Sequence, residues 1–189
     1  LNQRIGDIRE GINRQIGSTV VTINSYVQQL ADMNQRIVVA QAAGELQPAN
    51  DLNDQRDKLL SDLNKEIRVS SHNETDGSLS VFFGSGQPLL IGISTYKLEA
   101  VPGQEDLSRV EVSLKGAGGS LMSLPESLVN GGNLGGLLQF RSQTLDSAQN
   151  SLGRIATVLG DTFNAQHMLG QDMTGALGGA FFKTTAPSQ

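Results

Sequence analysis

The longest feature of the sequence is a stripe of apolar residues, spaced by three and four positions, across the first 45 residues. This spacing places the apolar side chains on one face of an α-helix. From Ile16 to Ile37 the repeat resembles a heptad, with Asn34 in a slot that a heptad fills with an apolar residue. A helix of about 40 residues is about 60 Å long, which favours a rod over a compact catalytic domain. The stripe consists of Ile5, Ile8, Ile12, Ile16, Val20, Ile23, Val27, Leu30 and Ile37.

A short break separates this helix from a second one. Gly44 can end the first helix in a left-handed conformation, and Pro48 cannot continue it. Asn50 or Asp51 is then the predicted N-cap of the second helix. The short connection predicts an antiparallel helical hairpin over residues 1–68. The first stripe is longer than the second, so part of it needs a third helix, further chain or a neighbouring subunit. The second stripe consists of Leu52, Arg56, Leu59, Leu60, Leu63 and Ile67.

Between residues 69 and 130 the pattern changes to that of β-strands. Apolar and polar residues partly alternate in short runs, and turn signals such as Asp76-Gly77 and Pro102-Gly103 separate these runs. We expect a small antiparallel insert of four or five short strands, which the glycines of residues 116–119 close. The strand candidates are residues 79–83, 89–91, 95–99 and 110–114.

Helical spacing returns after residue 131 and predicts a third helix over residues 131–169 that packs back on the rod. Arg141 and Arg154 are assigned to positions off its stripe. Residues 170–189 are interpreted as the truncated start of a further segment, because both ends of the chain resemble cuts in a longer protein. The predicted fold class is α+β: a long antiparallel helical hairpin plus a third helix, with a small antiparallel β-hairpin insert. The third stripe consists of Leu138, Leu145, Ala148, Leu152, Ile155, Leu159 and Phe163.

Composition narrows the classes of function. The 189 residues include 6 Phe, 2 Tyr and no Trp, and so few aromatic residues suit helix-on-helix packing better than a compact enzyme core. The net charge is −5 and no stretch is rich in Lys or Arg, which argues against nucleic-acid binding. The absence of cysteine excludes disulfides and thiol catalysis. No apolar run has the length of a membrane helix, and no start of the chain resembles a cleavable secretion signal.

Three carboxylates three residues apart form the most conspicuous polar cluster. A helix places Asp51, Asp54 and Asp57 near one face, as a carboxylate metal site requires. A simpler interpretation is that these acids complement the helix dipole in the first turn. Asp172 begins a short stretch that resembles a calcium loop, but the next oxygen ligands of such a loop are absent.

The remaining candidates give a weak case for catalysis. His72 is expected in a polar turn and His167 at the end of the last helix, and two distant histidines without cysteine make a poor metal or acid–base pair. The glycines of residues 131–136 do not follow a predicted strand, so they fit a flexible start of the last helix better than a phosphate loop. The sequence therefore yields no catalytic, cofactor-binding or metal-binding residue.

Five segments, in order along the chain, resemble one protein family, flagellar hook-associated protein 1. Asp51–Leu60 resembles the family pattern D-L-x-D-Q-R-D-x-L-L, and Asp76–Leu89 resembles D-G-S-x-x-V-x-x-G-x-G-Q-x-L. Gly131–Leu138 is similar to G-G-x-L-G-G-L-L. Asp161–His167 and Gly178–Phe182 complete a resemblance that covers nearly the whole chain, and the combination is more specific than any one segment.

The resemblance implies a structural subunit of the bacterial flagellum, not an enzyme, at the junction between hook and filament. It implies export through the flagellar type III apparatus without a cleavable signal, with an export chaperone for the full-length parent. Implied partners are the hook protein, the second junction protein and copies of the chain itself, with no cofactor, membrane or nucleic acid. Family members carry terminal heptad segments that this chain lacks, so we expect the chain to be monomeric in solution.

Three alternatives remain open at this point. Flagellin or another flagellar axial protein shares the helical plan. A coiled-coil signalling stalk or adhesin segment predicts unbroken heptads, against which Gly44, Pro48 and the β-rich insert argue. A hydrolase needs an acid–base pair in a pocket, which the sequence does not indicate.

Overall fold

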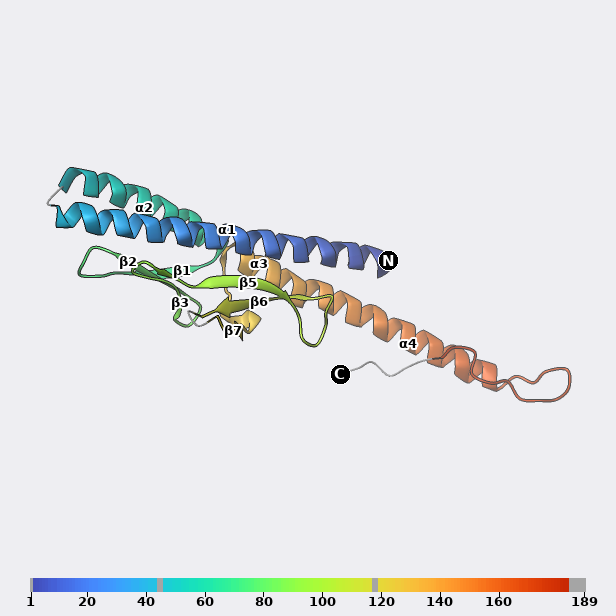
Figure 1. The fold of residues 1–189 in the computed structure, drawn as a ribbon. Coiled ribbons are helices and arrows are strands. Elements are labelled where there is room, and N and C mark those ends of the chain that lie inside the picture. The colour runs from blue at the N-terminus through green and yellow to red at the C-terminus, as the bar shows by residue number, and fades with distance from the viewer. Residues whose placement is uncertain (1, 44–45, 117–118, 184–189) are drawn as a thin grey trace.

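Two long antiparallel helices form one side of the molecule (Figure 1). The computed structural model describes residues 2–43, 46–116 and 119–183. Helix α1 spans Asn2–Ala42 and helix α2 spans Leu46–Glu66, and the two pack against each other. Together with the antiparallel strands described below, this hairpin confirms the predicted α+β fold class.

The second helix begins earlier than predicted. Pro48 lies in the first turn of α2 instead of before the helix, so neither Asn50 nor Asp51 is its N-cap. Proline is tolerated in a first turn because the first four N–H groups of a helix have no partner within it. Gly44, which we expected to end the first helix, lies outside the described residues.

The apolar stripe of α1 is covered largely within the chain. Its members from Ile12 to Ile37 are buried, whereas Ile8 near the N-terminal end is 47% exposed. The strands of the insert, rather than further chain or a neighbouring subunit, supply much of the surface that covers the stripe. The insert is thus part of the hydrophobic core, to which its strands contribute Leu79, Val81, Phe83, Leu89, Leu90, Leu98, Val112 and Leu114.

The insert consists of two small antiparallel sheets that lie along α1 (Figure 1). One sheet has the strand order β1-β2-β3-β4 and the other has the order β5-β6-β7. Ser71 in β1 lies opposite Val81 in β2, and Leu98 in β5 lies opposite Leu114 in β6. The strands are β1 (Val69–Asn73), β2 (Leu79–Phe83), β3 (Gln87–Ile91), β4 (Ser94–Thr95), β5 (Lys97–Pro102), β6 (Val110–Lys115) and β7 (Leu121–Ser123).

Two of these strands were not predicted from the sequence. In β1 only Val69 is partly buried, and all three residues of β7 are exposed, so neither strand shows the alternation that indicates a half-buried strand. Gly116 and Gly119 lie in the turn between β6 and β7, where the N–H of Gly119 donates to the carbonyl of Gly116 at 2.9 Å. These glycines therefore join two strands of the insert, and the prediction that they close it was wrong.

Asparagine side chains of α1 hold the sheets against the helix. Asn34 is 0% exposed, and its amide nitrogen donates to the carbonyls of Leu79 at 2.8 Å and Gly92 at 2.7 Å. Its Oδ1 accepts from the N–H of Leu79 at 3.0 Å. Asn24 bonds the carbonyl and the N–H of Leu98 in the same way, at 2.8 and 2.9 Å. Each amide thus satisfies backbone groups of a strand that would otherwise be buried without partners.

A third asparagine continues this row toward the N-terminus of α1. Asn13 donates to the carbonyl of Ser108 at 2.7 Å, and its Oδ1 accepts from the N–H of Val110 at 3.3 Å. The three asparagines are about three helical turns apart, so they lie on one face of α1. The polar residue that interrupts the heptad-like pattern at position 34 is therefore a specific attachment point for the insert.

The third helical segment is continuous but not uniform. Helix α3 (Gly132–Phe140) leads into the π-helical turn η2 (Arg141–Leu145), and helix α4 (Asp146–Met168) follows directly. Both α3 and η2 contact α1, whereas α4 runs past the N-terminal end of α1 and projects from the body (Figure 1). The segment of residues 131–169 therefore packs on the rod only up to the first turn of α4, instead of along its whole length.

The glycines before α3 are closely packed. Gly131 and Gly132 have φ angles of 77° and 66°, which favour glycine. A Cβ atom on Gly132 would lie 2.7 Å from the carbonyl carbon of Glu66. A Cβ on Gly135 would lie 3.0 Å from the carbonyl oxygen of Val129. Gly132 therefore lets α3 approach the end of α2, and Gly135 lets it approach the residues just before it, so the expected flexible connection is a tightly packed one.

Candidate assembly surface

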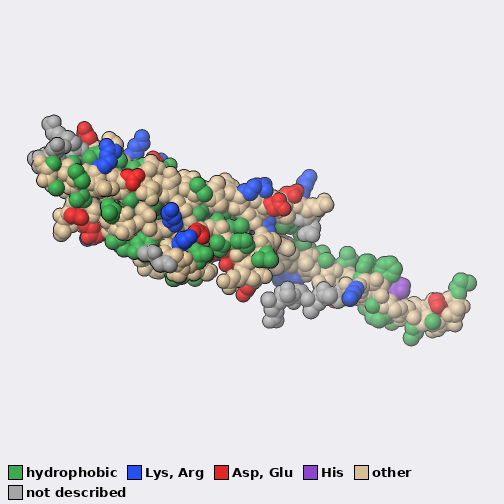
Figure 2. Space-filling model, in the orientation of Figure 1, with side chains coloured by type: hydrophobic (Ala, Val, Ile, Leu, Met, Phe, Trp, Pro, Cys, Tyr) green, Lys and Arg blue, Asp and Glu red, His purple; other side chains and the backbone are tan. Residues whose placement is uncertain are grey.

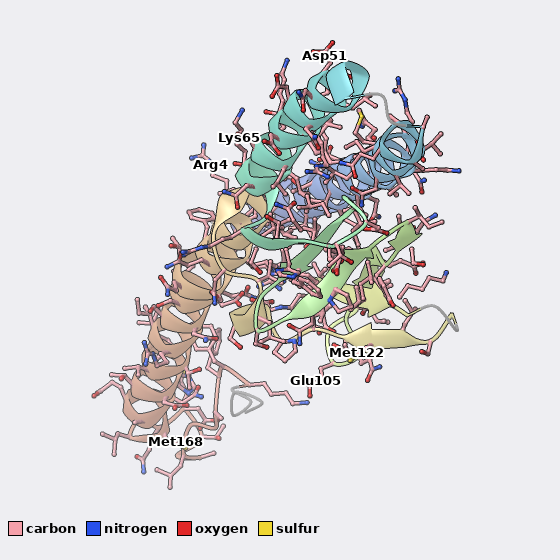
Figure 3. The ribbon with its side chains drawn as sticks, turned by 90° about the vertical axis from the view of Figure 1, so that its left-hand side faces the viewer. Arg4, Asp51, Lys65, Glu105, Met122 and Met168 are labelled. Carbon is pink, nitrogen blue, oxygen red and sulfur yellow. The ribbon has the colours of Figure 1, made fainter. Side chains whose placement is uncertain are left out.

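The three carboxylates of α2 do not form a site. Asp51, Asp54 and Asp57 are exposed, and Asp51 projects at the opposite end of the molecule from Met168 (Figure 3). The first turn of α2 contains no acidic residue, so the interpretation that these acids complement the helix dipole there was wrong. Among the residues that the structure describes, no group of three or more His, Cys, Asp or Glu side chains is arranged to hold a metal ion.

The two histidines lie in separate parts of the structure. His72 is an exposed residue of β1 opposite Ser80, so its predicted position in a turn was wrong. His167 lies in the last turn of α4, as predicted. Its Nδ1 donates to the carbonyl of Gly179 at 2.8 Å, because a carbonyl oxygen only accepts. The structure does not bring the two imidazoles together.

The stretch that resembles a calcium loop is a self-contained turn. Oδ1 of Asp172 accepts from the N–H and the hydroxyl of Thr174, at 2.8 and 2.7 Å, and from the N–H of Ala176 at 2.9 Å. The hydrogen bond from the Thr174 hydroxyl, followed by those from the backbone, holds the pKa of Asp172 below its usual value. The carboxylate therefore stabilises its own loop.

The chain after α4 folds back onto the end of this helix. Asn164 is buried, and its Oδ1 accepts from the N–H groups of Phe181 and Phe182, both at 2.8 Å. Its amide nitrogen donates to the carbonyl of Phe182 at 2.7 Å. The ring of Phe163 lies 5.6 Å from that of Phe181 and 5.2 Å from that of Phe182, measured between centroids. Two motifs separated in the sequence, Asp161–His167 and Gly178–Phe182, thus form one physical unit.

The projecting part of α4 carries an uncovered apolar face. Ile155, Val158 and Leu159 are 64%, 64% and 68% exposed, and Figure 2 shows hydrophobic side chains gathered along this part of the molecule. Large apolar side chains grouped on a surface are typical of a site of protein–protein contact. We define the assembly face as Ile155, Val158 and Leu159.

The face is uncovered because α4 projects beyond α1, and the π-helical turn shifts the apolar residues of α4 out of line with the buried row of α3. A regular α-helix that continued from Leu138 would place Ala148, Leu152, Leu159 and Phe163 on the same face as Leu138, because these positions continue the spacing of three and four. In η2 the N–H of Asp146 reaches the carbonyl five residues back, so the turn holds about one extra residue. One residue corresponds to about 100° of helical rotation. At the first turn of α4 the residue that contacts α1 is Gln149, one position after Ala148. Further along the helix, Asn164, one position after Phe163, is buried where the chain after α4 folds back.

A network of arginines and carboxylates surrounds η2. Arg141 is 1% exposed and donates to Glu126 at 2.5 Å and to the carbonyl of Val110 at 2.6 Å. Arg109 donates to Glu126 at 2.7 Å and to Asp146 at 2.9 Å. Burial alone raises the pKa of Glu126, but the hydrogen bonds from Arg109 and Arg141 outweigh burial and hold this pKa below its usual value.

The same network reaches α1 through Arg9. Its guanidinium lies 3.2 Å from the carboxylate of Asp146 and donates to Gln149 at 2.6 Å. It also lies 3.3 Å from Asp106 in the connection between β5 and β6. The network thus joins α1, the insert, η2 and the first turn of α4, and it sets the direction in which α4 leaves the body.

Arg141 was assigned to a position off the apolar stripe, and this assignment was wrong. The residue lies three positions after Leu138 and four before Leu145, both of which are buried. That spacing identifies it as a member of the buried row, and a buried arginine needs carboxylate or carbonyl partners. Its position in the stripe was therefore a signal in the sequence that the buried row contains an ion pair.

A surface hollow of about 380 Å³ lies beside the network and is lined in part by Arg109, Glu111, Val112 and Glu126. The carboxylate of Glu126 already accepts hydrogen bonds from two arginines. Its lowered pKa keeps this carboxylate ionised at neutral pH. The carboxylate therefore serves as a structural acceptor for the two arginines.

No helix in the described parts of the chain is long and apolar enough to cross a membrane.

Comparison with known proteins gives one consistent answer. The family model described as "Flagellar hook-associated protein FlgK helical domain" matches residues 1–182. Flagellar hook-associated protein 1 of Salmonella typhimurium is 39% identical over 186 residues, which are 98% of this chain and 34% of the relative. The protein of the same name from Escherichia coli is 36% identical over 187 residues, which are 99% of this chain and 34% of the relative. The chain spans about a third of the length of these relatives.

A solved structure supports the same relationship. The flagellar hook junction protein FlgK from Burkholderia pseudomallei is similar with a TM-score of 0.85 at 40% sequence identity. The match covers 98% of this chain and 33% of that one. The arrangement of the helical hairpin, the insert and the projecting helix is therefore shared with a protein of known structure.

Proposed function

This chain belongs to the family of the flagellar hook-associated protein FlgK, and we propose that the protein containing it is a structural subunit of the bacterial flagellum. In this proposal the subunit forms the adaptor between hook and filament by helical self-assembly. Its role is structural, without a catalytic, cofactor-binding or metal-binding residue. The match over residues 1–182 and the similarity to a hook junction protein of known structure support the proposal.

The proposed partners are other axial proteins of the flagellum. They are the hook protein on one side, the second junction protein on the other, and neighbouring copies of the subunit. The protein would act outside the cell after export through the flagellar type III apparatus, without a cleavable signal and with the help of an export chaperone. Contacts between copies would join two different patches, because such contacts generate a helical array of subunits.

The observation that carries an assembly role is the uncovered assembly face. Three large aliphatic side chains on one side of a projecting helix are each more than 60% exposed, while the equivalent stripe on α1 is almost fully buried. Covering these side chains removes apolar surface from water and stabilises the contact. A long rod with a free apolar face at one end suits a subunit that stacks lengthwise with its neighbours.

The proposed division of the chain follows from this role. Residues 1–68 form the rod, residues 69–130 the insert, residues 131–169 the third helix, and residues 170–189 the start of a further segment. The isolated chain is proposed to be monomeric, because three side chains bury much less area than the roughly 1,200 Å² of a stable interface. A sedimentation coefficient that rises with protein concentration would contradict the monomer.

Immunogold electron microscopy of intact flagella tests the proposed location. An antibody raised against this chain is expected to label only the narrow joint between hook and filament. Label along the whole filament would instead identify a flagellin, and label elsewhere on the cell would contradict a flagellar role.

A pair of matched substitutions tests the proposed use of the assembly face. Ile155→Gln in the full-length protein is expected to reduce swimming and the recovery of filaments attached to hooks. Ile93→Gln is the control, because Ile93 is equally exposed at 63% but lies in the insert, and it is expected to leave both unchanged. Equal effects of the two substitutions would mean that the assembly face has no special role.

A further inference from the structure

Only one asparagine of this chain is followed by glycine, and it lies at the surface. Asn130 precedes Gly131, and both residues are exposed. They join the 3-10 helix η1 (Glu126–Leu128) to α3. An asparagine followed by glycine can lose its side-chain amide spontaneously, because the glycine has no side chain to hinder attack of its backbone nitrogen on Cγ. The surface position gives water access to this pair.

The backbone N–H of Gly131 has no hydrogen-bond partner among the residues that the structure describes. Gly77, which follows Asp76, differs, because its N–H donates to the carbonyl of Glu74 at 3.1 Å. A peptide N–H gives up its proton less readily while it donates to a carbonyl. The nitrogen of Gly131 is therefore the better nucleophile of the two.

Within the described residues, the side chain of Asn130 is held at one atom only. Its amide nitrogen donates to the carbonyl of Ser127 at 2.6 Å, whereas its Oδ1 accepts no hydrogen bond from them. Asn24 and Asn34 are each held through both atoms of the amide. A single hydrogen bond at the surface is a weak restraint, since water can replace it. The carboxamide of Asn130 is thus free to turn toward Gly131.

We infer that Asn130 is a site of spontaneous deamidation in the folded protein. The nitrogen of Gly131 loses its proton to solvent and attacks Cγ of Asn130, and the side-chain nitrogen leaves as ammonia. Water then opens the resulting succinimide ring at either carbonyl. Cleavage at Cγ gives aspartate, whereas cleavage at the backbone carbonyl gives isoaspartate, in which the main chain runs through Cγ. The inference concerns the chain by itself and does not depend on the proposed flagellar role.

The isoaspartyl product is expected to loosen α3. It adds one carbon to the main chain, about 1.5 Å, directly before the tightly packed start of this helix. A Cβ atom on Gly132 would lie 2.7 Å from the carbonyl carbon of Glu66, so Gly132 has no room to move toward α2. The added length therefore displaces α3, whose Leu134 and Leu138 are buried in the core.

The aspartyl product is expected to be tolerated. It keeps the length of the main chain and changes an exposed amide to a carboxylate. Asn130 and Arg68 line the same surface hollow, and among the described residues that line it none is acidic. A carboxylate at position 130 would therefore lie near a cation and away from like charge.

Mass spectrometry of aged protein tests the site. The folded chain is incubated at mildly alkaline pH, and trypsin then releases residues 116–141, which contain Asn130 and Asn133. The mass shift from amide to carboxylate is expected at Asn130 and not at Asn133, which precedes the bulky Leu134 and is the internal control. Asn130→Gln is expected to abolish the shift, because its longer side chain would have to close a larger ring.

A parallel sample in urea separates the effect of the fold from that of the sequence. Conversion of Asn130 in the folded sample as well as in urea supports the inference. Absence of the shift from the folded sample, whether or not urea restores it, would overturn the inference. Equal conversion of Asn130 and Asn133 in the folded sample would also overturn it, since the glycine would then confer no special reactivity.

The isoaspartyl form is compared with Asn130→Asp, which has the same mass and charge and differs only in the path of the main chain. Protein isoaspartyl methyltransferase labels the isoaspartyl form and not the variant, so it identifies the fraction with the altered backbone. Urea denaturation is expected to give this fraction a lower midpoint than Asn130→Asp, whose midpoint should equal that of the native chain. Equal midpoints of the two forms would contradict the expected loosening of α3.

Discussion

Helices α1 and α4 carry the same kind of apolar stripe, but the stripe is buried in one and exposed in the other. In α1 two sheets fold against the stripe, and the amides of Asn13, Asn24 and Asn34 hold them there. In α4 the stripe lies on a helix that projects beyond the body, and a π-helical turn shifts it out of line with the buried row of α3. Spacing alone therefore tells which residues share a face, whereas covering that face depends on what the rest of the chain places opposite it.

The two helices also differ in what their apolar side chains do: those of α1 stabilise the fold, whereas those of α4 are free to contact another molecule. The body of the molecule buries its large aliphatic core residues to 9% exposure or less, and their removal from water is the main source of its folding free energy. The projecting helix leaves comparable residues in water, so it contributes little to stability and keeps its side chains free to contact another molecule.

The largest expected difference in the free energy of unfolding is between alanine substitutions of two leucines, one in α1 and one in α4. Leu30→Ala in α1 is expected to lower the free energy of unfolding by about 3–4 kcal/mol, because Leu30 is 0% exposed and its removal leaves a cavity. Leu159→Ala in α4 is expected to change it by less than about 0.5 kcal/mol. Urea denaturation followed by circular dichroism measures both. Similar losses for the two variants would show that the stripe of α4 is buried in solution.

Asn34→Ala is expected to lower the free energy of unfolding by about 2–3 kcal/mol. The substitution leaves the N–H and carbonyl of Leu79 without partners in a buried environment. Asn24→Ala is the comparison, and we expect a smaller loss because Asn24 is only partly buried. The same denaturation assay applies, and an equal or larger loss for Asn24→Ala would contradict the special role of the fully buried amide.

Glu126→Gln is expected to lower the free energy of unfolding by about 2 kcal/mol, because it leaves the buried Arg141 without a carboxylate. Glu99→Gln is its control and is expected to cost less than about 0.5 kcal/mol, since the pair of Glu99 with Lys115 is largely exposed.

The stability that Glu126 contributes is expected to depend on pH. The pKa of Glu126 is lowered in the folded state, so its contribution is fully present above its ordinary value of 4.5. It is lost as the pH falls through the lowered pKa of the folded state, because the unfolded chain then binds the proton more readily. The stability difference between the native chain and Glu126→Gln is thus expected to shrink below pH 4.5, and a constant difference would count against the proposed cause.

The smallest expected effect is confined to the segment that folds back after α4. Asn164→Ala removes three hydrogen bonds that hold the segment after α4, so hydrogen exchange at the amides of Phe181 and Phe182 is expected to accelerate by about tenfold, which corresponds to about 1.4 kcal/mol. Global unfolding is expected to stay unchanged. Asn150→Ala is the control on the same helix, and it should leave exchange at both amides as in the native chain.

Much of the fold was predictable because long periodic segments specify their own secondary structure. The helical hairpin, the strands from Leu79 to Phe83 and from Val110 to Leu114, and the α+β class were all predicted. Strands β1 and β7 were not, because an exposed edge strand needs no apolar alternation. The start of α2 was misplaced since proline in a first turn looks the same in the sequence as proline before a helix.

The candidate surface was predictable only in part. The apolar residues from Leu138 to Phe163 were predicted to form one stripe of an α-helix, but the π-helical turn at Arg141–Leu145 divides them between two helices. Their division into a buried half and an exposed half was not predicted, because a π-helical turn has no distinct pattern of residue types. Arg141 was the one available signal, since its position in the buried row required partners that only other elements supply.

The sequence by itself determined the long helices, the class of the fold and the family, because periodic apolar residues and ordered motifs act locally. The tertiary structure decided which faces are covered. That decision rests on contacts between residues far apart in the chain, above all Arg9, Arg109 and Arg141 with Glu126 and Asp146. These contacts coincide with one extra residue in a helical turn, and one residue is enough to turn an apolar face from the core to the solvent.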